Sequence, residues 1–232
     1  MPSAARIVDP RAIPVVGMDG HLPAVAAGRL DAHSLREHFR TRPAWTPEWA
    51  GDGLRQTTPA DTAASVLVPL VMREAGLQVL LTRRTDHLRD HAGQISFPGG
   101  RAEPTDLDEV DTALRETEEE VGLSRNLVEV IGQLPMYVTV TGYKVTPVVG
   151  LVQPDFSLAL DKFEVAEAFE VPLSFLMTPA HHRRHAVQVA GQSREFLSMP
   201  WQGSDRSGAG REYYIWGATA AMLRNLYRFL SL

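Results

Sequence analysis

Residues 115–123 read Arg-Glu-Thr-Glu-Glu-Glu-Val-Gly-Leu, a short way after Phe-Pro-Gly-Gly at residues 97–100. At about 100° per residue on a helix, Glu116, Glu119 and Glu120 fall within an arc of roughly 100°. Apolar positions gather on the opposite side of such a helix: Leu107, Val110, Leu114 and Val121. Like charges three and four residues apart disfavour a helix by about 0.2–0.5 kcal/mol per pair, so the crowding calls for compensation. A bound divalent cation would supply it, and the stretch predicts a metal site.

The predicted amphipathic helix covers about residues 106–121 and carries signals at both ends. Thr105 or Asp106 is suited to cap its N-terminus, because a short polar side chain can accept a bond from the first free amides. Two acidic residues suit the positive end of the helix dipole: Asp108 and Glu109. Gly122 is suited to the left-handed residue that ends a helix.

The composition points to one soluble domain. The chain has 232 residues, 44% of them hydrophobic, and no apolar run long enough to span a bilayer. A net charge of -5 argues against a nucleic-acid or acidic-membrane binder, so a polyanionic small-molecule substrate would need a local basic patch or a metal. The absence of cysteine excludes disulfides, zinc–thiolate sites and thiol nucleophiles. The start of the chain lacks the features of a secretory signal, and we expect a cytoplasmic protein.

The order of predicted elements favours an α/β fold. Residues 1–60 read as an N-terminal arm with a helix near 31–41, and residues 61–232 read as the main domain. A hairpin is expected at 63–72 and 77–82, followed by a loop at 86–96, further strands at 128–133, 136–141, 145–152 and 213–216, a short helical or turn segment at 164–169, and an amphipathic helix at 218–230. Such an order predicts a mixed sheet covered by helices on both faces. The oligomeric state stays open, a homodimer included.

The glycine-rich entry and the acidic helix together resemble the signature of the Nudix hydrolases. That signature is Gly, five residues, Glu, seven residues, then Arg-Glu-aliphatic-any-Glu-Glu-any-Gly-aliphatic. Here the residue after the five-residue interval from Gly100 is Asp106 instead of Glu. Eight residues rather than seven separate Asp106 from Arg115, and Thr117 stands at an aliphatic position. The resemblance implies a Nudix-type α/β/α sandwich with a mixed sheet.

A second motif upstream resembles the extra motif of the coenzyme A pyrophosphatases within that family. It reads Leu-Leu-Thr-any-Arg-Ser/Ala, then Arg, Gly and Phe-Pro-Gly-Gly at intervals of three residues. The matching residues are Leu80 to Arg84, Arg89, Gly93 and 97–100, and only Thr85 departs from the motif. The likeness extends over roughly residues 63–230 and implies hydrolysis of coenzyme A or its thioesters to 3′,5′-ADP and 4′-phosphopantetheine.

The resemblance also implies roles for individual residues. Mg²⁺ or Mn²⁺ would be held by carboxylate oxygens and one backbone carbonyl, from Glu116, Glu119, Glu120 and Gly100. Arg115 would orient a ligand carboxylate. The general base is open between Glu119, our first choice, and Glu164 or Glu167. Four residues are expected to grip the pyrophosphate or the 3′-phosphate: Arg84 and Arg89, with Arg83 and His91 as helpers.

Simpler interpretations accompany each of these. A run of glutamates is usually a solvated face, and Asp106 suits an N-cap as well as a metal role. Glu118 is expected to be solvated or ion-paired. Residues 181–185 (His-His-Arg-Arg-His) are read as a solvated loop rather than a metal site, and Tyr213, Tyr214 and Trp216 as core and strand residues. Two other functions stay open: a Nudix enzyme for another nucleotide substrate, and a non-catalytic Nudix-like module that binds a nucleotide.

Overall fold

The computed structural model describes residues 7, 9–41, 43–53, 62–87, 92–189, 191–205 and 207–232. Its larger sheet has eight strands, in the order β4-β3-β2-β8-β6, with β5 on β2, β7 on β8 and β9 on β3. The strands are β2 Thr62–Arg73, β3 Gly76–Arg84, β4 Ile95–Ser96, β5 Gly99–Arg101, β6 Val128–Gln133, β7 Tyr137–Val138, β8 Tyr143–Val152 and β9 Val165–Pro172. Only β2 and β8 pair in parallel, so the sheet is mixed as predicted.

A second, four-stranded antiparallel sheet lies beside the first. Its order is β1-β10-β11-β12, with β1 Val15–Met18, β10 Arg183–Val189, β11 Gln192–Ser204 and β12 Gly210–Trp216. The helices are α1 Ala32–Thr41, α2 Glu109–Val121, α3 Leu173–Leu176 and α4 Gly217–Leu230, with four 3₁₀ turns: η1 Pro10–Ala12, η2 Ala27–Arg29, η3 Arg125–Leu127 and η4 Pro179–His181. No helix in the described ranges has the length and apolar character needed to cross a membrane.

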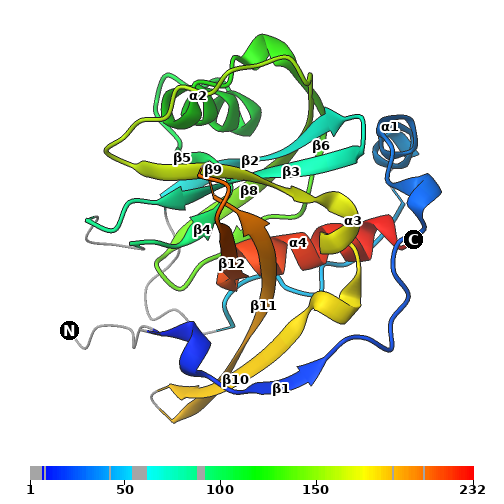
Figure 1. Cartoon of the computed structure of the whole chain (residues 1–232), viewed down its shortest axis with the longest axis vertical. Helices are drawn as coiled ribbons and strands as arrows, with labels where there is room; N and C mark the ends of the chain where they lie inside the picture. Colours follow the sequence, from blue (N-terminus) through cyan, green and yellow to red (C-terminus); the bar gives the residue numbers. More distant parts are fainter. Residues whose placement is uncertain are drawn as a thin grey trace.

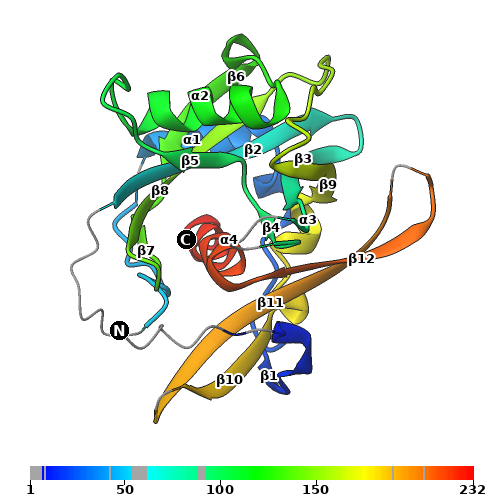
Figure 2. The same ribbon diagram turned by 90° about the vertical axis from the view of Figure 1, so that its left-hand side faces the viewer.

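Helix α2 covers one face of the larger sheet and α4 the other, where α4 lies between the two sheets (Figures 1 and 2). Strand β2 is buried on both faces of the sheet. Leu67 and Val71 pack with α2, while Val68 and Leu70 belong to the core around α4. A strand buried on both faces has no polar side, which explains the unbroken apolar run in the sequence.

The predicted hairpin is confirmed, since β2 and β3 pair antiparallel from Leu70 to Val79. The strands predicted at 128–133 and 145–152 and the helices near 31–41 and 218–230 are confirmed as β6, β8, α1 and α4. Pro147 sits inside β8 without a donor, at the point where the partner on one side changes from β7 to β6. Its carbonyl oxygen still accepts from the amide of Leu134 (2.9 Å).

Several predictions of local structure are wrong. Residues 165–169 belong to strand β9, not to a helical or turn segment, because β9 pairs along β3, and only Glu164 lies in the turn before it. The strand predicted at 136–141 shortens to β7. The loop predicted at 86–96 ends in strand β4, and part of it lies outside the described residues. Residues 183–189 form strand β10 rather than a solvated loop.

The acidic helix starts later than predicted. Its N-cap is Asp108, whose side chain accepts from the amide of Asp111 (2.8 Å), rather than Thr105 or Asp106. Leu107 therefore precedes the helix and is 90% exposed, so it is not part of the apolar side. Gly122 ends the helix with a φ of 71°, as predicted.

The described residues before 54 are tied to the rest of the chain by β1, by α1 and by a buried ion-pair cluster. The guanidinium of Arg224 on α4, 1% exposed, lies 3.0 Å from an oxygen of Asp19 and 2.7 Å from one of Glu48. Arg184 on β10 reaches the same two carboxylates at 2.8 and 2.6 Å. Because a buried charge is costly without a partner, these contacts bind the N-terminal segment to α4 and β10.

Candidate active site

The carboxylates of the acidic helix lie at three different depths. Glu119 is 61% exposed, Glu116 is largely covered, and Glu120 is buried at 7% exposure. The buried side of α2 also includes Thr117, whose hydroxyl donates to the carbonyl of Ala113 (2.6 Å). That bond satisfies the polar group that stands at the aliphatic position of the signature. The acidic face is thus partly sunk into the protein.

Gly99 and Gly100 bring bare backbone against two of these carboxylates. The amide of Gly99 donates to Oε2 of Glu120 (3.2 Å). A Cβ on Gly100 would run into the carboxylate of Glu116, and one on Gly99 would strike the backbone of Ser65 in β2. Gly99 has a φ of 150°, which L side chains rarely adopt. Gly99 therefore requires glycine, and a side chain at Gly100 would displace the carboxylate of Glu116.

Burial raises the proton affinity of Glu116 and Glu120, and the neighbouring carboxylates add to it. Burial is the largest cause that raises the pKa of Glu120 to about 7; the Gly99 amide and Arg84 oppose it, and the nearby charges of Glu164 and Glu116 add to it. Burial also raises the pKa of Glu116, against the effect of Arg115. Carboxylates that repel one another in a half-buried place are stabilised by a cation.

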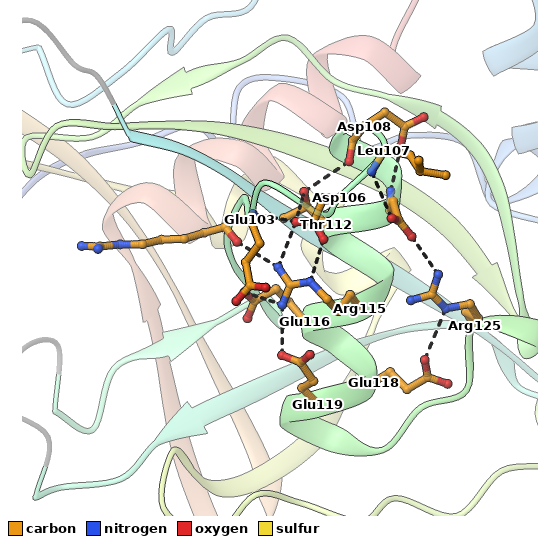
Figure 3. A network of polar contacts seen from close by, with 12 residues as sticks. Glu103, Asp106, Leu107, Asp108, Thr112, Arg115, Glu116, Glu118, Glu119 and Arg125 are labelled. Carbon is orange, nitrogen blue, oxygen red and sulfur yellow. Dashed lines mark hydrogen bonds and ion pairs between the residues drawn. The ribbon is translucent and has the colours of Figure 1, made fainter.

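Arg115 holds one side of this acidic face (Figure 3). Its Nη1 donates to Glu116 (3.1 Å) and to Glu119 (3.0 Å), and its Nη2 donates to the carbonyl of Arg101 (3.0 Å). Its Nε and Nη2 donate to the two oxygens of Asp106 at 2.7 and 3.0 Å. The guanidinium thus links two candidate metal ligands to one further carboxylate.

Asp106 is neither the N-cap of α2 nor a direct neighbour of Glu120. Besides Arg115 it accepts from the amide of Glu103 and the hydroxyl of Thr112, both at 2.8 Å. The hydrogen bond from Arg115 holds the pKa of Asp106 well below its usual range. Asp106 therefore remains ionised and fixes the arginine. Glu118 points away from this group (Figure 3) and pairs with Arg125 at 3.3 Å, as expected.

Two arginines of the upstream motif, Arg83 and Arg84, point to opposite faces of β3. Arg84 faces the acidic helix: its Nη1 is 3.7 Å from Glu120 and its Nη2 is 3.7 Å from Glu164. Arg83 lies on the other side of the pleat, 3.0 Å from Asp86 and 3.8 Å from Glu167. Arg83 is thus not brought to the same carboxylates. Arg89 and His91 lie outside the described residues.

Glu164 and Glu167, the alternative general bases, stand in different surroundings. Glu164 is partly exposed and faces Arg84. Glu167 is buried and accepts from the hydroxyl of Tyr213 (2.6 Å) and from Arg211 (3.1 Å). A carboxylate with both oxygens engaged by strand β12 links the two sheets. Glu164 is the one of the two that faces the acidic helix.

Two of the three histidines at residues 181–185, His182 and His185, are buried in the protein interior. His182 is fully buried with Nε2 2.8 Å from the carbonyl of Leu176, and His185 lies 2.8 Å from Ser198 and 2.9 Å from the carbonyl of Ile13. These histidines fill the interior rather than a solvated loop. Tyr213 and Tyr214 are also buried, as expected of core and strand residues.

Thr85, which departs from the upstream motif, holds a turn beside the site. Its hydroxyl donates to the carbonyl of Phe163 (2.7 Å) and its amide donates to the carbonyl of Glu164 (2.9 Å). Thr85 thereby holds the turn before β9 beside Arg84. The sequence contained one indication of this role: the motif allows Ser at this position, and Thr keeps the hydroxyl donor.

The residue types of this face fit a hard divalent cation. Carboxylate oxygens and a backbone carbonyl are the ligands that Mg²⁺ and Mn²⁺ prefer, and the missing side chain of Gly100 leaves the backbone open to Glu116. In the part of the chain that the structure describes, no three acidic or histidine side chains converge closely enough to enclose an ion as they lie. Glu116 and Glu119 are turned toward Arg115 instead. A cation would have to draw them away from it.

This combination of fold and acidic helix defines a hydrolase of the Nudix class. The NUDIX domain model matches residues 61–187, and the chain belongs to the Nudix hydrolase family. It is similar to the uncharacterized Nudix hydrolase NudL of Escherichia coli strain K12 and to that of strain O7:K1. Each is 43% identical over 164 residues, which cover 70% of this chain and 80% of the relative.

Solved structures also match. The MutT protein from Methanosarcina mazei Go1 is 26% identical with a TM-score of 0.41, covering 53% of this chain and 83% of that one. The NUDIX domain of Shewanella oneidensis NrtR, complexed with ADP ribose, is 20% identical with a TM-score of 0.38, covering 48% of this chain and 73% of that one.

Proposed function

We propose that this protein hydrolyses the pyrophosphate of coenzyme A, or of its thioesters, to 3′,5′-ADP and 4′-phosphopantetheine or its acyl form, in the cytoplasm. The observation that supports it is the meeting of the two motifs. Arg84, from the motif that resembles coenzyme A pyrophosphatases, lies 3.7 Å from Glu120 of the Nudix helix. The guanidinium of Arg84 therefore lies beside the acidic residues of α2. This arrangement suits a phosphate that is bound between the guanidinium and a metal ion.

Four groups would hold Mg²⁺ or Mn²⁺ there: Glu116, Glu119, Glu120 and the carbonyl of Gly100. Such a cation, when bound, neutralises charge on a pyrophosphate and increases the acidity of a water molecule. The chain contributes the carboxylates and keeps one of them, Glu120, in a position set by the Gly99 amide. Arg115 sets the positions of Glu116 and Glu119.

Arg84 is the proposed ligand of the pyrophosphate oxygens. Its Nε is buried and has no hydrogen-bond partner within the described residues, and its two ion-pair distances of 3.7 Å are longer than a hydrogen bond. The guanidinium thus retains donors for an anion. By resemblance Arg89 and His91 would extend this basic group, and Arg83 would act from the other side of β3.

The reaction requires a base to accept a proton from water while the water oxygen bonds to phosphorus and the anhydride P–O bond breaks. The released phosphate oxygen carries away the electron pair of that bond. We assign the base to Glu119, which is the most exposed carboxylate of the helix face. Glu164 is the alternative, because it faces Arg84 and has no hydrogen-bonded partner comparable with those of Glu167.

Product analysis after incubation with coenzyme A and Mg²⁺ or Mn²⁺ tests the proposal. We expect equal amounts of 3′,5′-ADP and 4′-phosphopantetheine from the wild type and from Glu118→Gln, and a loss of at least about 100-fold in Glu120→Gln. A clear preference for a nucleoside triphosphate or a nucleotide sugar in the same panel would contradict the substrate. Failure to cleave any member with Mn²⁺ would favour a binding module.

The role of Arg84 is tested by comparing two substrates. If Arg84 contacts the 3′-phosphate, Arg84→Gln raises KM more for coenzyme A than for the form without that phosphate. Equal increases for both substrates would limit Arg84 to the pyrophosphate. Arg73→Gln is a matched control, because Arg73 is a β2 arginine paired with Glu170 at 2.6 Å, away from the acidic helix.

A further inference from the structure

Phe163 stands exposed at the edge of the candidate active site. It lies in the turn just before β9, next to Glu164, and is 66% exposed. It is the only aromatic among the large apolar side chains that are exposed in the described ranges; the others are Val15, Val16, Met18, Leu107, Met136 and Leu232. A single exposed apolar residue is ordinary in a protein surface, so its surroundings decide whether it has a function.

The turn that carries Phe163 is firmly held. Its first residue, Asp161, donates its amide to the carbonyl of Glu120 (2.9 Å). The side chain of Asp161 accepts from the amide of Phe163 (2.8 Å), and its carbonyl accepts from the amide of Val165 (2.8 Å). The turn is thus bonded to α2 and to the start of β9. Phe163 is exposed on a fixed backbone.

Thr85 closes the other side of the turn. Its hydroxyl bonds the carbonyl of Phe163 at 2.7 Å and its amide bonds the carbonyl of Glu164 at 2.9 Å. Thr85 directly follows Arg84, whose guanidinium lies 3.7 Å from Glu164. Arg84 and Phe163 are therefore each adjacent in sequence to a residue of this bonded pair of segments, and the guanidinium of Arg84 reaches Glu164, the residue after Phe163.

One edge of the ring has a neighbour within the protein. The imidazole of His87 meets Phe163 with ring centroids 5.0 Å apart and planes at 62°, an edge-on contact. Such a contact favours one orientation of the phenyl ring and leaves most of its surface to solvent, since Phe163 is 66% exposed. An oriented aromatic face can stack a planar ring.

We propose that Phe163, oriented by His87, is the platform on which the adenine ring of the substrate stacks while its pyrophosphate lies against Arg84. This rests on the proposed function, since it requires a substrate that joins a nucleobase to a pyrophosphate. Stacking recognises the flat face of a base and contributes about 1–3 kcal/mol per base, which converts to about 5- to 150-fold in affinity. It would hold the adenosine half without contributing to bond cleavage.

Binding of ADP and of inorganic pyrophosphate, measured by calorimetry with Ca²⁺ in place of the activating metal, separates the base from the phosphates. We expect Phe163→Ala to weaken ADP at least fivefold and to leave pyrophosphate within twofold of the wild type. Phe163→Tyr should retain the affinity for ADP. Val16→Ala is the matched control, because Val16 is also exposed, at 62%, but lies on β1 of the second sheet.

Three results would overturn the platform. They are unchanged ADP affinity in Phe163→Ala, an equal loss of ADP and pyrophosphate, and an ADP affinity too weak to measure in the wild type. Failure of the platform and failure of the substrate proposal give different results. A wild type that binds ADP through Phe163 but does not cleave coenzyme A would keep the platform and refute the proposed substrate. Cleavage of coenzyme A with KM unchanged in Phe163→Ala would do the reverse.

Discussion

Asp106 and Arg115 form a two-point ion pair beside the acidic helix, with Oδ1 2.7 Å from Nε and Oδ2 3.0 Å from Nη2. The remaining terminal nitrogen of the arginine bonds Glu116 and Glu119. Asp106 thus acts on the candidate metal ligands through a third residue. Its shift by one place from the glutamate of the Nudix signature does not remove it from the site.

Asp106→Asn should lower kcat about tenfold with a smaller change in KM. Removing the charge weakens two charge-assisted hydrogen bonds, each about 1.5–3 kcal/mol, and frees Arg115 to move with its two glutamates. Steady-state kinetics with coenzyme A measure this effect. Asp111→Asn is the control, because Asp111 lies on the same helix and pairs with Arg125 instead (2.8 Å). Equal losses in both variants would refute the positioning role.

The raised pKa of Glu120 predicts a pH-dependent stability of the metal-free protein. Between the unfolded value near 4.5 and the folded value of about 7, the native state keeps a proton that the unfolded state has lost, so stability falls as pH rises. Glu120→Gln removes this loss and should be about 1–3 kcal/mol more stable than the wild type at pH 8.

Urea denaturation in excess chelator checks this value. The advantage of Glu120→Gln should shrink as the pH is lowered from 8 and disappear near pH 4. Glu118→Gln, on the exposed part of the same helix, should show no comparable trend. A difference between Glu120→Gln and the wild type that stays constant with pH would show that Glu120 is not protonated in the native state.

Binding of Mn²⁺ should raise the melting temperature of the wild type. A ligand that binds only the native state stabilises it by about 2.7 kcal/mol at 100 times its dissociation constant, which is several degrees for a chain of this size. Glu116→Gln and Glu120→Gln should lose most of this increase, and Glu118→Gln should keep it. Thermal melts with and without chelator provide the measurement. An increase retained by all three variants would place the metal elsewhere.

Glu167 is expected to support the fold rather than to serve as the base. Its two oxygens accept from Tyr213 and Arg211, so Glu167→Gln and Tyr213→Phe should each reduce the free energy of unfolding by about 1–2 kcal/mol. Both should leave kcat within about threefold at permissive temperature. A change in the pH profile of kcat in Glu167→Gln, absent from Tyr213→Phe, would contradict this and return Glu167 to catalysis.

The sequence predicted the elements whose patterns are regular. The acidic helix, the hairpin and the C-terminal helix were recognised because apolar spacing and glycine signals agreed. Strand β9 was missed because its inward positions are Val165, Glu167, Phe169 and Val171, and a buried glutamate at one of them breaks the alternation. Two partners from the other sheet, Tyr213 and Arg211, make that position tolerable.

The strand predicted at 213–216 is confirmed within β12, but the rest of the second sheet was missed for a similar reason. Strand β10 carries His185 and Arg184, which look like surface residues until Ser198 and Asp19 are brought to them by β11 and by the N-terminal segment. In the site, the spacing of the glutamates predicted a shared face, but not their different depths. Burial of Glu120 follows from the close approach of Gly99, which no local pattern contains.

Strand β1 and the ion pairs of Arg224 have a practical consequence for gene design. The family match begins at residue 61, and a fragment started there would lack Asp19 and Glu48, the carboxylate partners of a cation that is 1% exposed. It would also expose the backbone edge of β10 that β1 now covers. An open strand edge beside an unneutralised interior charge favours aggregation, so we expect such a fragment to accumulate in inclusion bodies.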